Sequence, residues 1–120
     1  MTVYFSVRLV GPTPNIGRVE VFADGEWGTV CDDGFDMNDA NVTCNQLGFN
    51  GALLFGPEAR FGAGTGRVLL DDLHCTGDEA SILKCERHSG VGESNCNHGE
   101  DVGVICTSPG EWNNARWVKI

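Results

Sequence analysis

The sequence predicts a small α+β domain in which a curved antiparallel sheet cradles one longer and one short α-helix. Segments of alternating apolar and polar residues, typical of half-buried strands, occur near both ends of the chain. A segment with helix-capping signals lies between them. The six cysteines are even in number and contain no C-x-x-C pair, which indicates a disulfide framework in an oxidising compartment and argues against a zinc ribbon.

Three strands are expected to follow one another at the start of the domain. Residues 7–10 alternate between apolar and polar side chains, and the glycine- and proline-containing segment 11–15 turns the chain. Residues 17–22 place apolar side chains at every other position. Because residues 23–25 are typical of a hairpin turn, we expect residues 27–31 to return as the third strand.

The longer helix is expected to begin after Asp36. This residue is a good N-cap, and Asp39 adds negative charge to the first turn, where the helix dipole favours it. Gly48 is expected to end the helix. The buried side is expected to consist of Ala40, Val42, Cys44 and Leu47.

The second half of the chain is expected to alternate between loops and short elements. Residues 55–65 are glycine-rich and predict a loop. Residues 68–73 and 102–106 are expected to form strands, and residues 78–85 a short helix. The length predicts one domain. Ser-Pro-Gly at residues 108–110 breaks the pattern, so residues 108–120 are expected to be a C-terminal extension or linker.

The net charge of −9 bears on possible partners. A nucleic-acid binder would carry a basic face, so we expect no nucleic-acid partner, and adsorption to anionic membranes is also disfavoured. Apolar runs are far shorter than the roughly 20 residues that a membrane-spanning helix needs, so we expect no membrane insertion.

Seven motifs occur in one order along the chain. They are Val-Arg-Leu-Val-Gly at 7–11, Gly-Arg-Val-Glu-Val at 17–21, Trp-Gly-Thr-Val-Cys-Asp-Asp at 27–33, Cys-Asn-Gln-Leu-Gly at 44–48, Leu-Asp-Asp at 70–72, Asn-Cys at 95–96 and Glu-Asp-Val-Gly-Val-Ile-Cys at 100–106. Together they resemble the scavenger receptor cysteine-rich (SRCR) domain. The resemblance covers residues 7–107 and implies that residues 1–6 are an N-terminal extension. The six cysteines are similar to those of its group A, and this resemblance implies the disulfides Cys31–Cys96, Cys44–Cys106 and Cys75–Cys85.

Acidic residues stand beside two of these cysteines. Asp32 and Asp33 follow Cys31, and Glu100 follows Cys96 by four residues. If these cysteines are bonded, the carboxylates come together and repel one another, and a hard cation such as Ca²⁺, or Mg²⁺, would relieve that repulsion. Acidic doublets also cap helices and accept hydrogen bonds from loop amides, which remains the alternative.

The resemblance implies two cation sites. Family members bind cations at the positions that match Asp32, Asp33 and Glu100. A second site in the family matches Asp71 and Asn95, with Asp72 alongside. A bound cation would allow this acidic chain to contact anionic groups, and Arg60 and Arg67 would add forked contacts to sulfate or phosphate. Solvation of the surface is the alternative role of the two arginines.

Two further features concern modification and catalysis. Asn41-Val42-Thr43 is an N-glycosylation acceptor motif. The chain contains three histidines, His74, His88 and His98, but no serine or cysteine stands in a recognisable nucleophile motif. We therefore expect that the chain is not an enzyme.

The SRCR resemblance implies an extracellular binding module, secreted or part of a receptor ectodomain. Its expected function is Ca²⁺-dependent recognition of polyanionic ligands in a scavenger or innate-immune receptor, the partners being microbial surface polymers, modified lipoproteins, anionic glycans or host glycoproteins. The alternative is a structural or protein–protein interaction module within a larger secreted protein, such as a multidomain protease or amine oxidase. A third alternative, a cytosolic zinc protein, predicts six free thiols.

Overall fold

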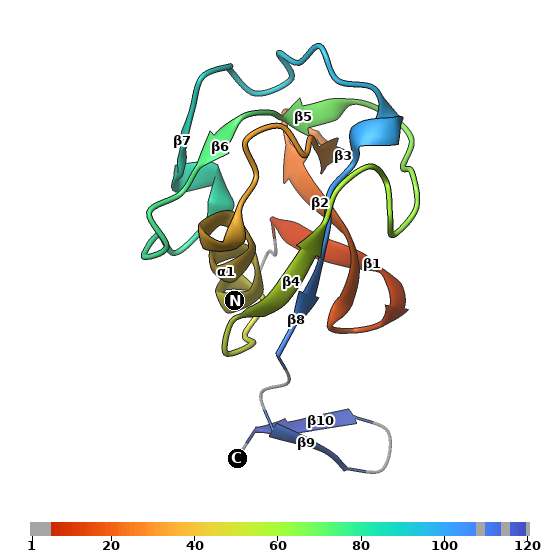
Figure 1. Cartoon of the computed structure of the whole chain (residues 1–120), viewed down its shortest axis with the longest axis vertical. Coiled ribbons are helices and arrows are strands. Elements are labelled where there is room, and N and C mark those ends of the chain that lie inside the picture. Colours follow the sequence, from red (N-terminus) through yellow and green to blue (C-terminus); the bar gives the residue numbers. More distant parts are fainter. Residues whose placement is uncertain (1–5, 108–109, 114–115, 120) are drawn as a thin grey trace.

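A computed structural model describes residues 6–107, 110–113 and 116–119 (Figure 1). The strands are β1 (Val7–Thr13), β2 (Ile16–Ala23), β3 (Glu26–Val30), β4 (Ala52–Gly56), β5 (Val68–Leu70), β6 (Leu73–His74), β7 (Glu86–Arg87), β8 (Gly103–Cys106), β9 (Gly110–Asn113) and β10 (Arg116–Lys119). The helices are α1 (Met37–Gln46) and two 3₁₀ helices, Ile82–Lys84 and His98–Glu100. No helix in this described part is long and apolar enough to cross a membrane.

The main sheet has six strands in the order β4-β8-β2-β3-β5, with β1 paired to β2. Every pair is antiparallel except β3 and β5, which are parallel and pair Val30 with Leu70. The Cys31 N–H donates to the Leu70 carbonyl oxygen at 2.8 Å. Because parallel strands end at the same edge, the segments that follow β3 and β5 leave the sheet side by side.

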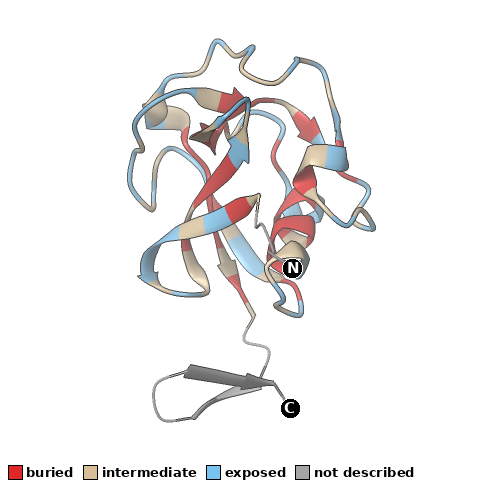
Figure 2. Cartoon of the chain, turned by 180° about the vertical axis from the view of Figure 1, so that it is seen from behind, coloured by how far each residue is buried: buried red, intermediate tan, exposed pale blue. Residues whose placement is uncertain are grey.

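The core lies between this curled sheet and α1. Val19, Val21, Leu69 and Val104 are fully buried strand residues, and Figure 2 shows buried positions gathered on the central strands and on the inward side of the helix. Ala40, Val42 and Cys44 are buried and Leu47 packs against the core, which confirms the helix face predicted from the sequence.

The start of α1 is also as predicted. The Asp36 carboxylate accepts hydrogen bonds from the backbone N–H groups of Asn38 and Asp39. The Asp39 carboxylate accepts the Asp36 N–H in return at 2.8 Å, which completes a capping box. Gly48 follows the helix with φ +94°, a backbone conformation that glycine adopts without strain.

Three disulfides cross-link the domain, with the pairing that the family resemblance implied. Cys44–Cys106 joins α1 to β8, and Cys31–Cys96 joins the end of β3 to the last loop. Cys75–Cys85 closes a short loop between β6 and β7. All six cysteines are therefore bonded, and no thiolate is free to bind zinc.

Three expected elements differ from the structure. The helix expected over residues 78–85 is only the 3₁₀ turn Ile82–Lys84, which Ser81 caps by accepting the Leu83 N–H. The loop expected from residue 55 begins later, because residues 52–56 form β4 along β8. The strand expected over residues 68–73 is interrupted at Asp72, whose φ of +58° is incompatible with a continuous strand.

The C-terminal segment, expected as an extension or linker, contains a separate two-stranded sheet. Strand β9 pairs antiparallel with β10, and neither pairs with the main sheet. In Figure 1 this hairpin lies beyond the end of β8.

Candidate metal and ligand site

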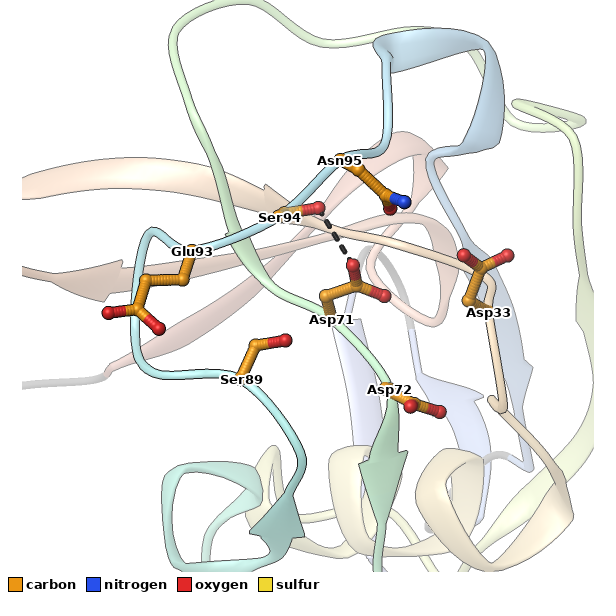
Figure 3. Close-up of a pocket in the computed structure, with 7 residues that line it drawn as sticks. All are labelled: Asp33, Asp71, Asp72, Ser89, Glu93, Ser94 and Asn95. Atoms are coloured by element: carbon orange, nitrogen blue, oxygen red, sulfur yellow. Dashed lines mark hydrogen bonds between the residues drawn. The ribbon is translucent and has the colours of Figure 1, made fainter.

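An open pocket of about 460 Å³ lies where the segments after β3 and β5 leave the sheet (Figure 3). Its walls come from three segments of the chain: the turn after Cys31, the break after β5, and the loop before Cys96. The residues that line it are Asp33, Asp71, Asp72, Ser89, Glu93, Ser94 and Asn95. The parallel β3–β5 pair and the Cys31–Cys96 disulfide together account for this convergence.

Asp71 is the buried member of the pocket, with 6% of its surface exposed. Its Oδ2 accepts a hydrogen bond from the Ser94 hydroxyl at 3.0 Å. Its Oδ1 is buried and has no hydrogen-bond partner among the described residues. A buried carboxylate oxygen without a partner is costly, so Asp71 points to a cation or other donor that completes its surroundings.

Asp33 faces Asp71 across the pocket (Figure 3). One carboxylate oxygen from each residue lies in a group of atoms that are all within 4.8 Å of one another. Asp33 Oδ2 also lies 3.5 Å from the Cys96 sulfur, a contact without a hydrogen because that sulfur is in a disulfide. Partial desolvation raises the pKa of Asp33, and the charges of Asp71, Asp32 and Asp72 raise it further.

Asp32 and Glu100 lie beside this pocket and do not line it. The Asp32 N–H donates to the Glu100 carbonyl oxygen, and Asp32 Oδ2 accepts the Glu58 N–H, each at 2.8 Å. Partial burial raises the pKa of Glu100, with further contributions from Asp33, Asp32 and Asp71. The structure therefore brings both predicted carboxylate sets into one acidic region, in which Asp33 interacts with members of each.

The pocket lining also includes Ser89, Glu93 and Ser94, which no sequence pattern predicted. Ser94 donates to Asp71 and its Oγ accepts the Cys96 N–H at 3.0 Å. The Glu93 carboxylate accepts the Gly90 N–H at 3.1 Å within the same loop. No motif marks these positions; only the nearness of Ser94 to Cys96 in the sequence would have suggested one of them.

A hydrogen-bonded pair, His98 and Asp101, holds the segment that carries Glu100. Asp101 Oδ2 accepts from His98 Nδ1 at 2.9 Å and from the Gly64 N–H at 2.7 Å. His98 Nε2 lies 2.9 Å from the Gly66 carbonyl oxygen, so a protonated ring satisfies both acceptors. These contacts raise the pKa of His98, the Gly66 carbonyl being the largest cause and Asp101 the next.

The remaining predicted residues lie outside the pocket lining. Arg67 is half-exposed and forms ion pairs with Glu26 at 3.4 Å and Asp24 at 3.6 Å. Arg60 is exposed in the loop after β4. Asn41 Oδ1 accepts the Ala52 N–H at 2.8 Å, and its glycosylation stays a prediction.

Gly34 offers a test of how tightly this region is built. Its φ is +72°, and a Cβ added there would lie 2.5 Å from Asp72 Oδ1. We expect Gly34→Ala to lower the free energy of unfolding by about 1–2 kcal/mol through backbone strain, and further by displacing Asp72. Urea denaturation followed by circular dichroism measures the loss.

Gly25→Ala is the matched control for this substitution. Gly25 has a similar φ of +78°, and nothing lies within 4 Å of the added Cβ. It therefore reports the backbone strain alone. Equal losses for Gly34→Ala and Gly25→Ala would show that Asp72 moves aside freely.

Comparisons with known proteins agree with the observed fold. A sequence profile described as "Scavenger receptor cysteine-rich domain" matches residues 9–107. Lysyl oxidase homolog 2A of Danio rerio is 57% identical over 90 residues, which are 75% of this chain and 12% of that protein. A scavenger receptor cysteine-rich domain superfamily protein of Patiria pectinifera is 58% identical over 97 residues, 81% of this chain and 8% of that protein.

Solved structures match over most of their own length. The third SRCR domain of murine neurotrypsin superposes with a TM-score of 0.77 and 45% identity, covering 86% of this chain and 96% of that one. The SRCR domain of mouse MARCO, in its dimeric form, gives a TM-score of 0.72 and 42% identity, covering 84% and 94%. By contrast, the chain spans 8–13% of the length of the curated relatives it matches.

Proposed function

This chain belongs to the scavenger receptor cysteine-rich domain family, and we propose that it is an extracellular, non-catalytic module that binds polyanionic ligands with the help of Ca²⁺. The three disulfides support an oxidising, extracellular setting. The proposal includes membership of the six-cysteine group A, because the chain has six cysteines and no further pair.

The observation that carries the proposal is the buried Asp71. Its unpartnered Oδ1, the Asp33 carboxylate close by, and the Asn95 side chain at the rim form a set of oxygen donors. Hard divalent cations prefer such donors, and Ca²⁺ tolerates irregular arrangements of about six to eight oxygens better than Mg²⁺ does. Desolvation is the largest cause of the raised pKa values of Asp33 and Glu100, and the repulsion between carboxylates that adds to it is what a cation would remove.

The residues present fit Ca²⁺ in two neighbouring groups. Asp71, Asp33 and Asn95 would hold one ion in the pocket, with Asp72 at its edge, and Asp32 with Glu100 would contribute to a second beside it. Two bound ions would change the formal net charge from −9 to −5 (−9 + 4). Bound Ca²⁺ supplies open coordination positions for sulfate, phosphate or carboxylate oxygens of a ligand.

Microbial surface polymers, modified lipoproteins, anionic glycans and host glycoproteins share such anionic groups. Arg60, exposed in the loop after β4, would add a forked contact.

Calorimetric titration of Ca²⁺ tests the ion-binding step. We expect Asp71→Asn to weaken Ca²⁺ binding by at least about tenfold, because the substitution removes a charged ligand. The matched control is Asp78→Asn, which makes the same charge change at an exposed carboxylate that accepts no hydrogen bond from the described residues. Equal affinities in the Asp71→Asn variant and the parent chain would contradict the proposal.

Binding of the chain to immobilised dextran sulfate tests the ligand-binding step. We expect binding in Ca²⁺ buffer and its loss in EDTA, and we expect Asp71→Asn to reduce binding in Ca²⁺ where Asp78→Asn does not. Binding that is equal with and without chelator would reject a role for the cation.

A second candidate function is a protein–protein interaction module within a larger secreted protein. It is favoured by the small share of each relative that the chain spans, and by relatives named lysyl oxidase homologs. In that case the domain would position an enzyme or its substrate, in an amine oxidase or a multidomain protease. Chelator-insensitive binding to one protein partner, together with no binding to dextran sulfate, would favour this candidate.

A further inference from the structure

A second cluster of possible metal ligands lies on the short β6–β7 ribbon. The strands pair Leu73 with Arg87 and His74 with Glu86. Leu73 is 1% exposed and faces the core, so strand alternation puts His74 and Glu86 on the opposite, solvent-facing side. His88 follows Glu86 by two residues and is also exposed.

Asp72 completes this cluster from the break before β6. Its Oδ1 lies 3.5 Å from His74 Nε2. One ligand atom each from Asp72, His74 and His88 all lie within 4.8 Å of one another. The two imidazole rings meet edge to face, with centroids 4.7 Å apart and an interplanar angle of 82°. Three donors of metal-binding type therefore converge on one exposed face.

Space for an ion exists beside these donors. An open pocket of about 520 Å³ is lined by His74, Glu86, Arg87 and His88. The Arg87 guanidinium donates a hydrogen bond to the Leu83 carbonyl oxygen at 3.1 Å, which holds this positively charged side chain at the neighbouring 3₁₀ helix. Glu86, opposite His74 in the ladder, is the available fourth donor.

We propose that His74, His88 and Asp72 form a site for Zn²⁺ or a similar borderline divalent cation, separate in its chemistry from the acidic pocket. Imidazole nitrogen and carboxylate oxygen are zinc ligands, with bonds of about 2.0–2.2 Å. Ca²⁺ takes oxygen ligands only, so the two histidines select against it. Closing the ligand atoms around the ion requires only rotations of exposed side chains.

Three protein ligands leave the fourth position of a tetrahedral zinc site for Glu86, a water, or a donor from another molecule. Asp72 also borders the acidic pocket, so the two sites adjoin through this one residue. Figure 3 shows Asp72 at the lower edge of that pocket, where the chain enters the next strand. The inference does not rest on Ca²⁺ binding, because the histidines contribute nothing to the acidic pocket.

Calorimetric titration of ZnCl₂ into the Ca²⁺-saturated, disulfide-bonded chain tests the site. We expect one Zn²⁺ per chain, and at least tenfold weaker binding for His74→Gln and for His88→Gln. The matched control is His98→Gln. It removes the third histidine of the chain, which lies outside this cluster, and should leave Zn²⁺ affinity unchanged. Thermal unfolding checks that all three variants are folded.

Electron paramagnetic resonance of the chain with one equivalent of Cu²⁺ gives an independent readout. We expect nitrogen hyperfine structure from two imidazoles, reduced to one in either His74→Gln or His88→Gln.

Three results would overturn the inference: no Zn²⁺ binding to the parent chain, Zn²⁺ affinity unchanged in both histidine variants, or stoichiometric release of Ca²⁺ by Zn²⁺. The last result would assign the binding to the acidic pocket. Unchanged Ca²⁺ affinity in the histidine variants would keep this test distinct from that of the proposed function.

Discussion

Replacing Cys44 and Cys106 together with alanine is expected to lower the free energy of unfolding by about 4 kcal/mol. The bridge joins residues that are 62 apart in sequence, so it removes much of the conformational freedom of the unfolded chain. Both cysteines are fully buried, and the lost sulfur atoms also leave a cavity between α1 and β8. A domain of this size is stable by only about 5–15 kcal/mol, so the variant should be close to unfolding at 37 °C.

Urea denaturation followed by circular dichroism measures this loss. The comparison is the Cys75→Ala, Cys85→Ala variant, whose bridge spans 10 residues and should contribute about 3 kcal/mol. The slope of unfolding free energy against urea must be fitted for each variant, because removing a cross-link exposes more surface in the unfolded state. A smaller loss for the Cys44–Cys106 bridge than for the short bridge would contradict the expectation.

Asp39→Ala is expected to destabilise the domain by about 3 kcal/mol. The carboxylate is fully buried and accepts two backbone hydrogen bonds, from the Asp36 N–H and from the Cys75 N–H, each at 2.8 Å. Alanine leaves both donors without this partner, and the Cys75 donor is buried. It also cuts the link between the start of α1 and the β6–β7 region.

Asp36→Ala is the control for this variant, because it removes only the exposed half of the capping box. The expected loss is about 1 kcal/mol, typical of a single N-cap. If Asp36→Ala and Asp39→Ala lower the free energy of unfolding equally, the hydrogen bond from the Cys75 N–H to Asp39 contributes nothing measurable to stability.

Asp39 also predicts a dependence of stability on pH. Burial raises its pKa from 3.8 to about 6, against the lowering effect of its two backbone hydrogen bonds. Because the folded state holds this proton more tightly than the unfolded chain does, the contribution is full below about pH 4 and is lost as the pH rises through about 6. This contribution to the free energy of unfolding is at most about 3 kcal/mol.

Asp39→Asn does not titrate, so it isolates this contribution from that of the other carboxylates. The stability difference between the parent chain and Asp39→Asn should shrink as the pH rises from about 4 to about 6. Urea denaturation at several pH values in that range measures it. A difference that stays constant would show that Asp39 has an ordinary pKa.

Features with local causes were predictable from the sequence. Asp36 and Asp39 have the spacing of a capping box, and α1 begins where they indicate. The first three strands follow from alternation and a turn signal. The disulfide pairs came from the family resemblance, because six cysteines by themselves allow many pairings.

Features with tertiary causes were not predictable. Strand β4 exists because β8 offers it a ladder partner, although its own residues, Ala52–Gly56, do not alternate between buried and exposed. The break at Asp72 depends on a left-handed backbone conformation that no local pattern signals. Ser81, not an earlier residue, starts the 3₁₀ turn, and residues 78–80 stay outside it.

The candidate site shows the same division. The acidic doublets were visible in the sequence, and their nearness followed from the Cys31–Cys96 bridge that the family resemblance implied. The grouping of Asp33 with Asp71 follows from the parallel β3–β5 pair, which the sequence did not indicate. The pocket wall formed by Ser89, Glu93 and Ser94 depends on the path of one loop. The Gly92 N–H fixes that path by donating a hydrogen bond to the Leu69 carbonyl oxygen.

The interleaved bridges Cys31–Cys96 and Cys44–Cys106 have a mechanical consequence. When the domain is pulled from its two ends within a longer protein, tension passes across the sulfurs and bypasses most of the chain. Only the segment before Cys31 and one short arm between the bridges would extend, while roughly 200 Å of contour length stays locked. The acidic pocket is lined by residues from 33 to 95, which lie inside the locked part, so the two bridges would keep its segments tethered to one another even when the strands before Cys31 are pulled away.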